Sequence, residues 1–332
     1  MRTHVALVLT LLVLSRCSFA QSSRFIVDDD AFETKVTAAA SKLRASGKLL
    51  TQETLRAEVK TKGFAAKLGP PAQPKLAAPD LYEKLRRSTF AIGLFYKCPD
   101  CGEWHFNSST GFVVSETGIL CTCCHVVVEQ DETIKESYVV AADAAGHVFP
   151  VRAVLAADTE SDTCFVRIDA RGLQPLPFRF GARTGERVYC LSHPGGYYFM
   201  FTEGMIARLN RRPNDALDDN NKSATQHKRP VLFLNVTAEF APGSSGAPIV
   251  DEAGNVVGQV ASIVDAGEPE QGDDQTAASP SVAIRFCTAA EEIQRLTDPH
   301  LSEAPESRVP RQNGPEGKPK IRKLRATNRP CQ

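Results

Sequence analysis

The segment Ala241-Pro242-Gly243-Ser244-Ser245-Gly246-Ala247-Pro248-Ile249-Val250 is the most informative stretch of this 332-residue sequence. It begins as a tight turn rich in glycine and serine and ends as an apolar strand. With glycine at position 243, the backbone N–H groups of Gly243 and Ser245 can point at one spot, where a negatively charged oxygen would be stabilised. We therefore expect a turn that presents a serine hydroxyl beside two amide donors.

A serine hydroxyl is a weak nucleophile without a base, so histidines are the next residues to weigh. His125 follows the apolar run 118–124, which we expect to be a strand, with the histidine at its far end. His193 lies in the loop 192–196, directly before Pro194 and two glycines, and we interpret it as a residue that stabilises that loop. His125 is therefore the candidate base.

A carboxylate beside the base would hold the imidazole in one tautomer and stabilise its charged form. Asp162 directly precedes an apolar strand, where its side chain could be buried next to His125. Asp158 is the alternative carboxylate in the same segment. The candidate catalytic residues are therefore His125, Asp162 and Ser245.

These motifs, in this order, resemble trypsin-like serine peptidases with two β-barrels, nearest the bacterial Deg-type (high-temperature-requirement) group. In that family the histidine ends a Leu-Thr-Ala-Ala-His strand, the aspartate opens an Asp-Leu-Ala-Val-Leu strand, and the serine lies in Gly-Asn-Ser-Gly-Gly-Pro. The matching segments here are 120–125, 162–166 and 243–248. The resemblance covers roughly residues 88–296 and assigns the nucleophile to Ser245 rather than Ser244. Ala247 departs from the family pattern, because it replaces the second glycine after the serine.

The resemblance implies peptide hydrolysis through an acyl-enzyme, with an oxyanion hole formed by the N–H groups of Gly243 and Ser245. It also implies that a substrate strand adds to an edge of the second barrel, for which Val260, Ala261 and Ser262 are weaker candidates. Glu239 is a weaker candidate for the S1 pocket, where an acid would favour lysine or arginine. The alternative is a solvated glutamate at a strand end. We expect no cofactor, and the expected partners are protein or peptide substrates.

Short β-branched and aromatic runs separated by glycine, asparagine and aspartate dominate from residue 90 onward. This texture predicts an all-β fold, which the resemblance specifies as a double β-barrel of the trypsin-like serine protease type. The predicted peptidase domain spans 80–297, with a crossover between barrels near 170–185 and a closing helix at 288–296. Helices at about 28–47 and 51–62 and a Pro-rich linker form a predicted N-terminal extension, 21–79. That extension would either cover a cleft or serve as a packing element.

Residues 1–20 are typical of an export signal, because basic residues precede the apolar run 5–14, which is too short to span a bilayer. Ser18 and Ala20 are small residues suited to cleavage after position 20. We therefore expect a periplasmic or extracellular protein without stable membrane insertion after cleavage. The alternative is an uncleaved membrane anchor.

The remainder of the chain gives weaker signals. Lys+Arg and Asp+Glu each number 39, so the net charge gives no argument for a nucleic-acid partner, and none is expected. Residues 298–332 are predicted to be a basic disordered tail, and we expect no PDZ-like domain after the barrels. The polar insertions 210–230 and 265–280 are predicted to be exposed loops. Oligomeric state cannot be read from the sequence.

Cysteine usage leaves several alternatives open. Of ten cysteines, Cys17 lies in the predicted signal, so an odd number remains and full pairing within one chain is excluded. Cys98 and Cys101, with His105 nearby, form either half of a zinc knuckle, a short-loop disulfide or a pair of reduced thiols, and metal binding is the weaker interpretation. Five further cysteines are expected to be small buried hydrophobic residues: Cys121, Cys123, Cys124, Cys164 and Cys190.

Two functions from different classes follow from these observations. The first is an exported serine endopeptidase with a His-Asp-Ser triad. The second is a catalytically silent protein that keeps the barrels and binds peptides or acts as a scaffold. The presence of all three motifs in family order favours the peptidase.

Overall fold

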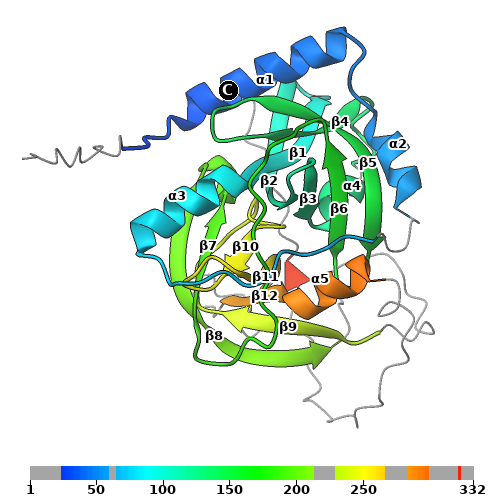
Figure 1. Ribbon diagram of the computed structural model, residues 1–332. Helices are drawn as coiled ribbons and strands as arrows, with labels where there is room; N and C mark the ends of the chain where they lie inside the picture. Colours follow the sequence, from blue (N-terminus) through cyan, green and yellow to red (C-terminus); the bar gives the residue numbers. More distant parts are fainter. Residues whose placement is uncertain are drawn as a thin grey trace, which may run out of the picture.

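The computed structural model describes residues 24–59, 65–129, 131–212, 229–265, 283–298 and 321–322. The predicted signal segment, most of both polar insertions and nearly all of the predicted tail lie outside these ranges. The described part of the chain forms two closed antiparallel β-barrels with helices on their outer surfaces (Figure 1). The predicted double barrel is therefore confirmed.

The first barrel contains six strands in the order β1-β2-β3-β6-β5-β4. Buried apolar side chains from its strands form a hydrophobic core cluster, which includes Phe90, Leu120 and Val166. Gly93 on β1 is required by the pairing with β2, because a Cβ atom there would lie 2.1 Å from the carbonyl oxygen of Asn107. The strands are β1 (Thr89–Lys97), β2 (Trp104–Ser115), β3 (Ile119–Thr122), β4 (Ser137–Ala142), β5 (Val148–Asp158) and β6 (Thr163–Ile168).

The second barrel begins after a crossover without strands and closes through the pairing of β10 with β11. Its strand order is β10-β7-β8-β9-β12-β11, and a two-residue strand, β13, adds to β11. Val188, Leu234 and Val260 belong to its core. The strands are β7 (Arg187–Ser192), β8 (Met200–Arg212), β9 (Val231–Val236), β10 (Pro248–Val250), β11 (Val256–Asp265), β12 (Ala283–Ala289) and β13 (Ile321–Arg322).

Helices connect and cover the barrels. Helix α5 contacts β5 of the first barrel and β9, β11 and β12 of the second, so it spans the junction between them. Helix α3 directly precedes β1 and was not expected from the sequence, which predicted the end of a linker at residue 79 and the start of the peptidase domain at residue 80. The helices are α1 (Asp29–Ala45), α2 (Gln52–Glu58), α3 (Ala78–Ser88), α4 (Cys124–Val128), α5 (Ala290–Thr297) and the 3-10 turn η1 (Pro194–Gly196).

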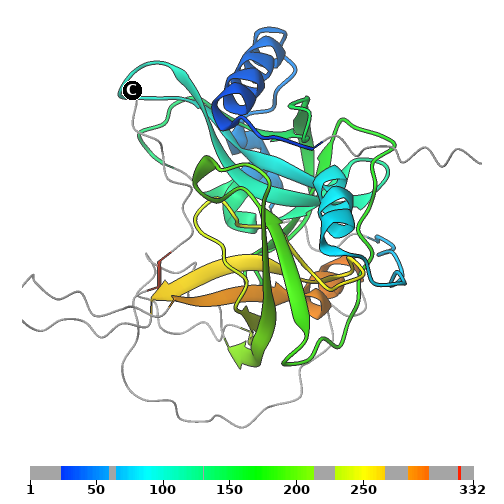
Figure 2. The same cartoon turned by 90° about the vertical axis from the view of Figure 1, so that its left-hand side faces the viewer.

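The N-terminal helices pack on the first barrel (Figures 1 and 2). Asp28 caps α1 by accepting a hydrogen bond from the N–H of Ala31 at 2.9 Å, and the helix buries Phe32, Val36 and Ala40. The Phe32 ring lies 4.3 Å from the ring of Tyr198, centroid to centroid. The helical extension is therefore an integral packing element of the domain.

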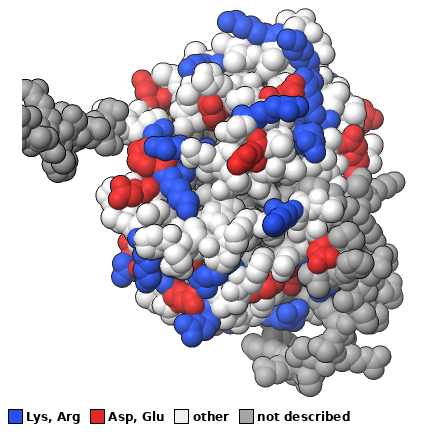
Figure 3. All heavy atoms as spheres, viewed as in Figure 1, with Lys and Arg blue, Asp and Glu red and all other residues white. Residues whose placement is uncertain are grey.

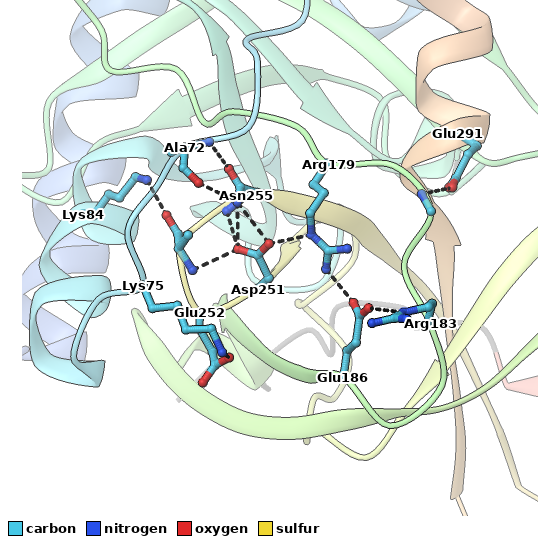
Figure 4. Close-up of polar contacts among 12 residues, drawn as sticks. Ala72, Lys75, Lys84, Arg179, Arg183, Glu186, Asp251, Glu252, Asn255 and Glu291 are labelled. Carbon is cyan, nitrogen blue, oxygen red and sulfur yellow. Dashed lines mark hydrogen bonds and ion pairs between the residues drawn. The ribbon is translucent and has the colours of Figure 1, made fainter.

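The Pro-rich segment is also fastened to the second barrel (Figure 4). The N–H of Ala72 donates to the side-chain oxygen of Asn255 at 2.6 Å, and the Asn255 side chain in turn donates to the carboxylate of Asp251. Arg179 of the crossover donates to Asp251 at 2.7 Å and to Glu186 at 2.6 Å. The predicted linker is thus held by the turn between β10 and β11.

Two expectations differ from the structure. His125 lies in the first turn of α4 rather than at the end of a strand, because the chain leaves β3 after Thr122 and turns into a short helix. The predicted disordered tail contains strand β13, since main-chain pairing with β11 fixes Ile321 and Arg322. The remaining residues of that tail lie outside the described ranges. On the face seen in Figure 3, basic and acidic side chains are interspersed.

The structure contains no helix long and apolar enough to cross a membrane within the ranges it describes.

Candidate active site

His125 and Asp162 form a two-point contact. The Nδ1 atom of His125 lies 2.6 Å from Oδ2 of Asp162, and the backbone N–H of His125 donates to Oδ1 at 3.0 Å. The side chain of Asp162 is 3% exposed, whereas that of His125 is 12% exposed. The carboxylate therefore fixes both the ring and the backbone of the histidine in a nearly dry setting.

The backbone of Asp162 is held by the second barrel. Gln259 on β11 is fully buried, and its side-chain N–H groups donate to the carbonyl oxygens of Asp162 at 3.0 Å and Thr122 at 3.4 Å. The N–H of Cys124 donates to the same Asp162 oxygen at 3.3 Å. Asp162 has φ +54°, a conformation that costs free energy for a residue with a side chain and persists only when its surroundings fix it.

The serine turn distinguishes its two hydroxyls. The hydroxyl of Ser244 donates to the hydroxyl of Ser192 at 3.0 Å and accepts a hydrogen bond from the N–H of Ala241 at 3.4 Å. Ser244 therefore has a structural role in joining the turn to β7. This observation agrees with the assignment of Ser245 as the nucleophile.

Two glycines give the turn its shape. Gly243 has φ +97°, and a Cβ atom there would lie 2.4 Å from the carbonyl oxygen of His193. Gly246 has φ +83°, and a Cβ atom there would lie 2.3 Å from the carbonyl oxygen of Thr110. Both positions combine a left-handed backbone with a close approach, so only glycine fits.

Hydrogen bonds on the opposite side orient the amides of the predicted oxyanion hole. The carbonyl oxygen of Pro242 accepts from the N–H of Gly195 at 2.6 Å, and that of Ser244 accepts from the N–H of Ala247 at 2.9 Å. In a trans peptide the N–H points away from the C=O. The N–H groups of Gly243 and Ser245 therefore point away from those partners, as an oxyanion hole requires.

The serine turn is anchored against the strands that lead to His125. The N–H of Thr110 on β2 donates to the carbonyl oxygen of Ser245 at 2.9 Å, and the Thr110 hydroxyl donates to the carbonyl oxygen of Gly243 at 2.9 Å. A Cβ atom on Gly246 would lie 2.5 Å from the hydroxyl oxygen of Thr122, the last residue of β3. The three candidate catalytic residues thus come from elements that meet at the junction of the barrels.

Ala247 occupies the position where the family has a second glycine. Only Asp162 and Phe199 are non-glycine residues with positive φ in the described ranges, so Ala247 has an ordinary backbone conformation. Its side chain is fully buried in the core of the second barrel. The methyl group is therefore accommodated without backbone strain.

Arg229 joins the segment before Asp162 to the second barrel, and sequence reasoning missed it. Its guanidinium donates to Asp158 at 2.6 Å, to Glu160 at 3.1 Å and to Glu292 of α5 at 2.6 Å. Asp158 also accepts a hydrogen bond from the hydroxyl of Ser161 at 2.8 Å. Although burial lowers the pKa of Arg229, the surrounding carboxylates outweigh it and raise that pKa.

The alternative carboxylate and the alternative histidine have other partners. Asp158 is bound to Arg229 and Ser161, as described above. His193 is fully buried, its Nδ1 accepts a hydrogen bond from the N–H of Phe199 at 3.0 Å, and burial lowers its pKa to about 3. A neutral, buried ring with this partner agrees with a loop-stabilising role for His193.

The cysteines around the site are buried thiols, as expected. Burial raises the pKa of Cys121, Cys123 and Cys124 well above its ordinary value, and it raises the pKa of Cys190 to about 12. Cys164 is also fully buried. Because the thiolate is the reactive form, the raised pKa values keep the thiols of Cys121, Cys123, Cys124 and Cys190 inert.

The structure treats the predicted substrate-binding residues differently: Val260 has its main-chain groups paired within the barrel, and Glu239 is exposed. Both main-chain groups of Val260 are already used, since its N–H donates to Ala247 and its carbonyl oxygen accepts from Gly246, each at 2.9 Å. Ala261 and Ser262, at the bulge that follows, stay predictions for the strand-binding edge. The side chain of Glu239 is 81% exposed and lies 3.7 Å from Arg285, which favours the alternative of a solvated glutamate.

Comparison with known proteins agrees with this geometry. Residues 109–258 match the family model of the trypsin-like peptidase domain. The matched segment is similar to a trypsin-like peptidase domain, and it contains His125, Asp162 and Ser245.

Curated relatives match about half of the chain. A "Probable periplasmic serine endoprotease DegP-like" of Halomonas elongata is 27% identical over 155 residues, which are 45% of this chain and 28% of that protein. "Protease Do-like 1, chloroplastic" of Arabidopsis thaliana is 28% identical over 156 residues, 46% of this chain and 32% of that protein. The "Uncharacterized protein y4bJ" of Sinorhizobium fredii is 29% identical over 164 residues, 48% of this chain and 22% of that protein. The match thus spans less than a third of the length of each of these relatives.

Proposed function

We propose that this protein is an exported serine endopeptidase that hydrolyses peptide bonds through Ser245, His125 and Asp162. The single observation that carries the proposal is the buried contact between the imidazole of His125 and the carboxylate of Asp162, which is the arrangement a general base needs. The named functions of the DegP-like and Do-like relatives support the same reaction class.

The proposed mechanism follows from the roles of the three residues. Ser245 attacks the carbonyl carbon of the peptide while His125 takes the hydroxyl proton, and the charged ring is stabilised by Asp162. The oxyanion that forms accepts hydrogen bonds from the N–H groups of Gly243 and Ser245, and each such donor contributes a factor of about 10² to 10³ in kcat. His125 then protonates the leaving amine, and water hydrolyses the acyl-enzyme by the reverse sequence of proton transfers.

Labelling with a fluorophosphonate probe tests this proposal, because such a probe reacts only with a serine activated by an assembled base and oxyanion hole. We expect residues 21–332 to be labelled and the Ser245→Ala variant not to be. Ser244→Ala is the matched control, since it removes the neighbouring hydroxyl, and we expect it to retain labelling. A wild-type protein that is folded but not labelled would instead favour the catalytically silent peptide-binding protein.

Export and substrate class are part of the same proposal. The apolar run 5–14 with small residues at 18 and 20 supports export, as does the word periplasmic in the name of the Halomonas relative. Mass spectrometry of the protein recovered from fractionated cells would test this, since we expect a mature N-terminus at residue 21 outside the cytoplasm. The proposed substrates are extended peptides that pair with the backbone of Ala261 and Ser262.

A further inference from the structure

Two cysteines and a histidine converge at the tip of the β1–β2 hairpin, apart from the proposed active site. The ligand atoms of Cys98, Cys101 and His105 all lie within 4.8 Å of one another. Sγ of Cys101 lies 3.1 Å from Nε2 of His105. Cys98 is buried, His105 is partly buried and Cys101 is exposed, so the cluster has an inner side and a side open to solvent.

The register of the hairpin produces this convergence. His105 pairs with Tyr96 across the strands, so the two side chains lie on the same face. Cys98 lies one residue beyond the end of β1, and the bond from its N–H to the carbonyl oxygen of Glu103 at 2.8 Å holds it next to the pair. The cluster is therefore fixed by strand pairing rather than by a chance approach of surface side chains.

The turn between the cysteines is equally well determined. The N–H of Gly102 donates to the carbonyl oxygen of Cys98 at 3.0 Å, and the N–H of Cys98 donates to the carbonyl oxygen of Glu103 at 2.8 Å. Gly102 has φ +73° with open space around its Cα, so the left-handed backbone itself is what requires glycine here. These bonds close the Cys-Pro-Asp-Cys-Gly segment into a compact loop that presents Cys101 towards His105.

The donor set determines which ligand fits. Two thiolates and one imidazole are the ligands that Zn²⁺ prefers, at about 2.3 Å for sulfur and about 2.0–2.1 Å for nitrogen. A tetrahedral ion with these bond lengths separates sulfur from nitrogen by about 3.6 Å. The 3.1 Å separation of Cys101 and His105 thus needs to widen by only a few tenths of an ångström, which rotation of the exposed Cys101 side chain can supply.

We propose that Cys98, Cys101 and His105 bind one Zn²⁺ ion with a structural role. The fourth position of the ion would be filled by water. Trp104, at the start of β2, stacks on Phe95 of β1 at 4.6 Å between ring centroids. The hairpin tip also contacts α1, because the guanidinium carbon of Arg44 lies 4.4 Å from the centroid of the Trp104 ring. An ion at the tip therefore strengthens the attachment of the N-terminal extension to the first barrel.

Metal analysis of the purified protein tests this proposal without reference to peptidase activity. The protein is prepared under reducing conditions without chelator, dialysed against Zn²⁺ and then against buffer. We expect about one Zn²⁺ ion per chain in the wild type and at least about a tenfold loss in Cys101→Ser and His105→Ala. Cys101 is exposed, so its substitution by serine is not expected to prevent folding. His147→Ala is the matched control, because it removes another exposed histidine from a β-turn, and we expect it to retain the ion.

Two further measurements identify the ligands and the role of the ion. Cobalt-loaded wild-type protein should show thiolate-to-cobalt charge-transfer absorption, and this absorption should be lost in Cys101→Ser. Chelation should lower the Tm of the wild type by roughly 5–10 °C and leave that of Cys101→Ser unchanged. The proposal is overturned if the reduced wild type takes up no Zn²⁺, or if Cys101→Ser and His105→Ala bind as much as the wild type.

Discussion

The carboxylate of Asp162 contacts His125 at two atoms, with one oxygen 2.6 Å from Nδ1 and the other accepting the backbone N–H at 3.0 Å. A second pair in the same chain repeats this geometry on the surface. Asp143 contacts Nδ1 of His147 at 2.9 Å and its backbone N–H at 2.9 Å, but that histidine side chain is 68% exposed. The two pairs differ in burial and in their position relative to the serine turn.

The exposed pair of Asp143 and His147 provides a control for a test of Asp162. Asp162→Asn should keep the shape of the site but lose the charge that stabilises imidazolium and the acceptor that sets the tautomer. We expect kcat for a peptide substrate to fall by a factor of about 10⁴. Asp143→Asn makes the same chemical change in the exposed pair and should leave kcat unchanged. Equal effects of the two substitutions on kcat would contradict the assigned role of Asp162.

Gln259 provides a second prediction, about positioning. Gln259→Leu leaves the buried carbonyl oxygens of Asp162 and Thr122 without this donor, which should lower the free energy of unfolding by about 1–3 kcal/mol. We also expect kcat to fall, because the strained backbone of Asp162 loses one of its supports. Urea unfolding and steady-state kinetics measure the two effects separately.

A comparable glutamine controls for general destabilisation. Gln52 is also buried and donates to two carbonyl oxygens, those of Val127 at 3.1 Å and Glu129 at 2.7 Å, but it does not contact Asp162. Gln52→Leu should therefore cost similar stability with a smaller change in kcat. If both variants lose kcat in proportion to stability, Gln259 has no special positioning role.

Arg229 carries a third prediction. Arg229→Met removes the cation that joins Asp158, Glu160 and the 2%-exposed side chain of Glu292. We expect the free energy of unfolding to fall by about 3 kcal/mol, because a buried carboxylate loses its main partner. Arg211 and Arg295, at 3.9 and 4.0 Å from Glu292, compensate only in part.

A double-mutant cycle distinguishes this network from loss of packing. Adding Glu292→Gln to Arg229→Met removes the unpaired buried charge, so the double variant should be more stable than Arg229→Met alone. Urea unfolding measures all four proteins. Additive losses would show that the ion pair between Arg229 and Glu292 does not account for the effect.

The sequence predicts the barrels and the candidate triad but not what joins them. His125, Asp162 and Ser245 are readable because each lies in a short local motif. Arg229 lies in an insertion predicted to be an exposed loop, and its contacts with Asp158 and Glu292 depend on how distant segments meet. Gln259 did leave a signal, since it is the one polar side chain in the apolar run 256–261, and such a residue must find buried partners.

The pattern of apolar and polar residues also misplaced two boundaries of secondary structure, the start of α4 and the start of α3. The run leading to His125 is apolar throughout, so the change from strand β3 to helix α4 is invisible in its hydrophobicity. Residues 78–88 were predicted to belong partly to a linker because prolines precede them, yet Pro79 occupies the first turn of α3, where proline is well tolerated.

Asp251 provides a prediction about pH. Burial alone raises its pKa, but hydrogen bonds from the side chain and backbone of Asn255, from Arg179 and from the N–H of Ala253 outweigh burial and lower it below the ordinary value of 3.8. The charged form is therefore the form that stabilises the fold. Its contribution is complete above the unfolded-state pKa and is lost as the pH falls through that value towards the lower pKa of the folded protein.

The variant Asp251→Asn measures this contribution, since it lacks the charge at every pH. We expect it to be less stable than the wild type at about pH 6, and the difference in urea midpoint should shrink as the pH falls from about 5 to about 3. Glu186 also shares Arg179, which with Arg183 outweighs partial burial and lowers its pKa, so Glu186→Gln in both backgrounds separates its contribution from that of Asp251. A difference that stays constant over this range would mean that the carboxylate charge does not stabilise the turn that holds the Pro-rich segment.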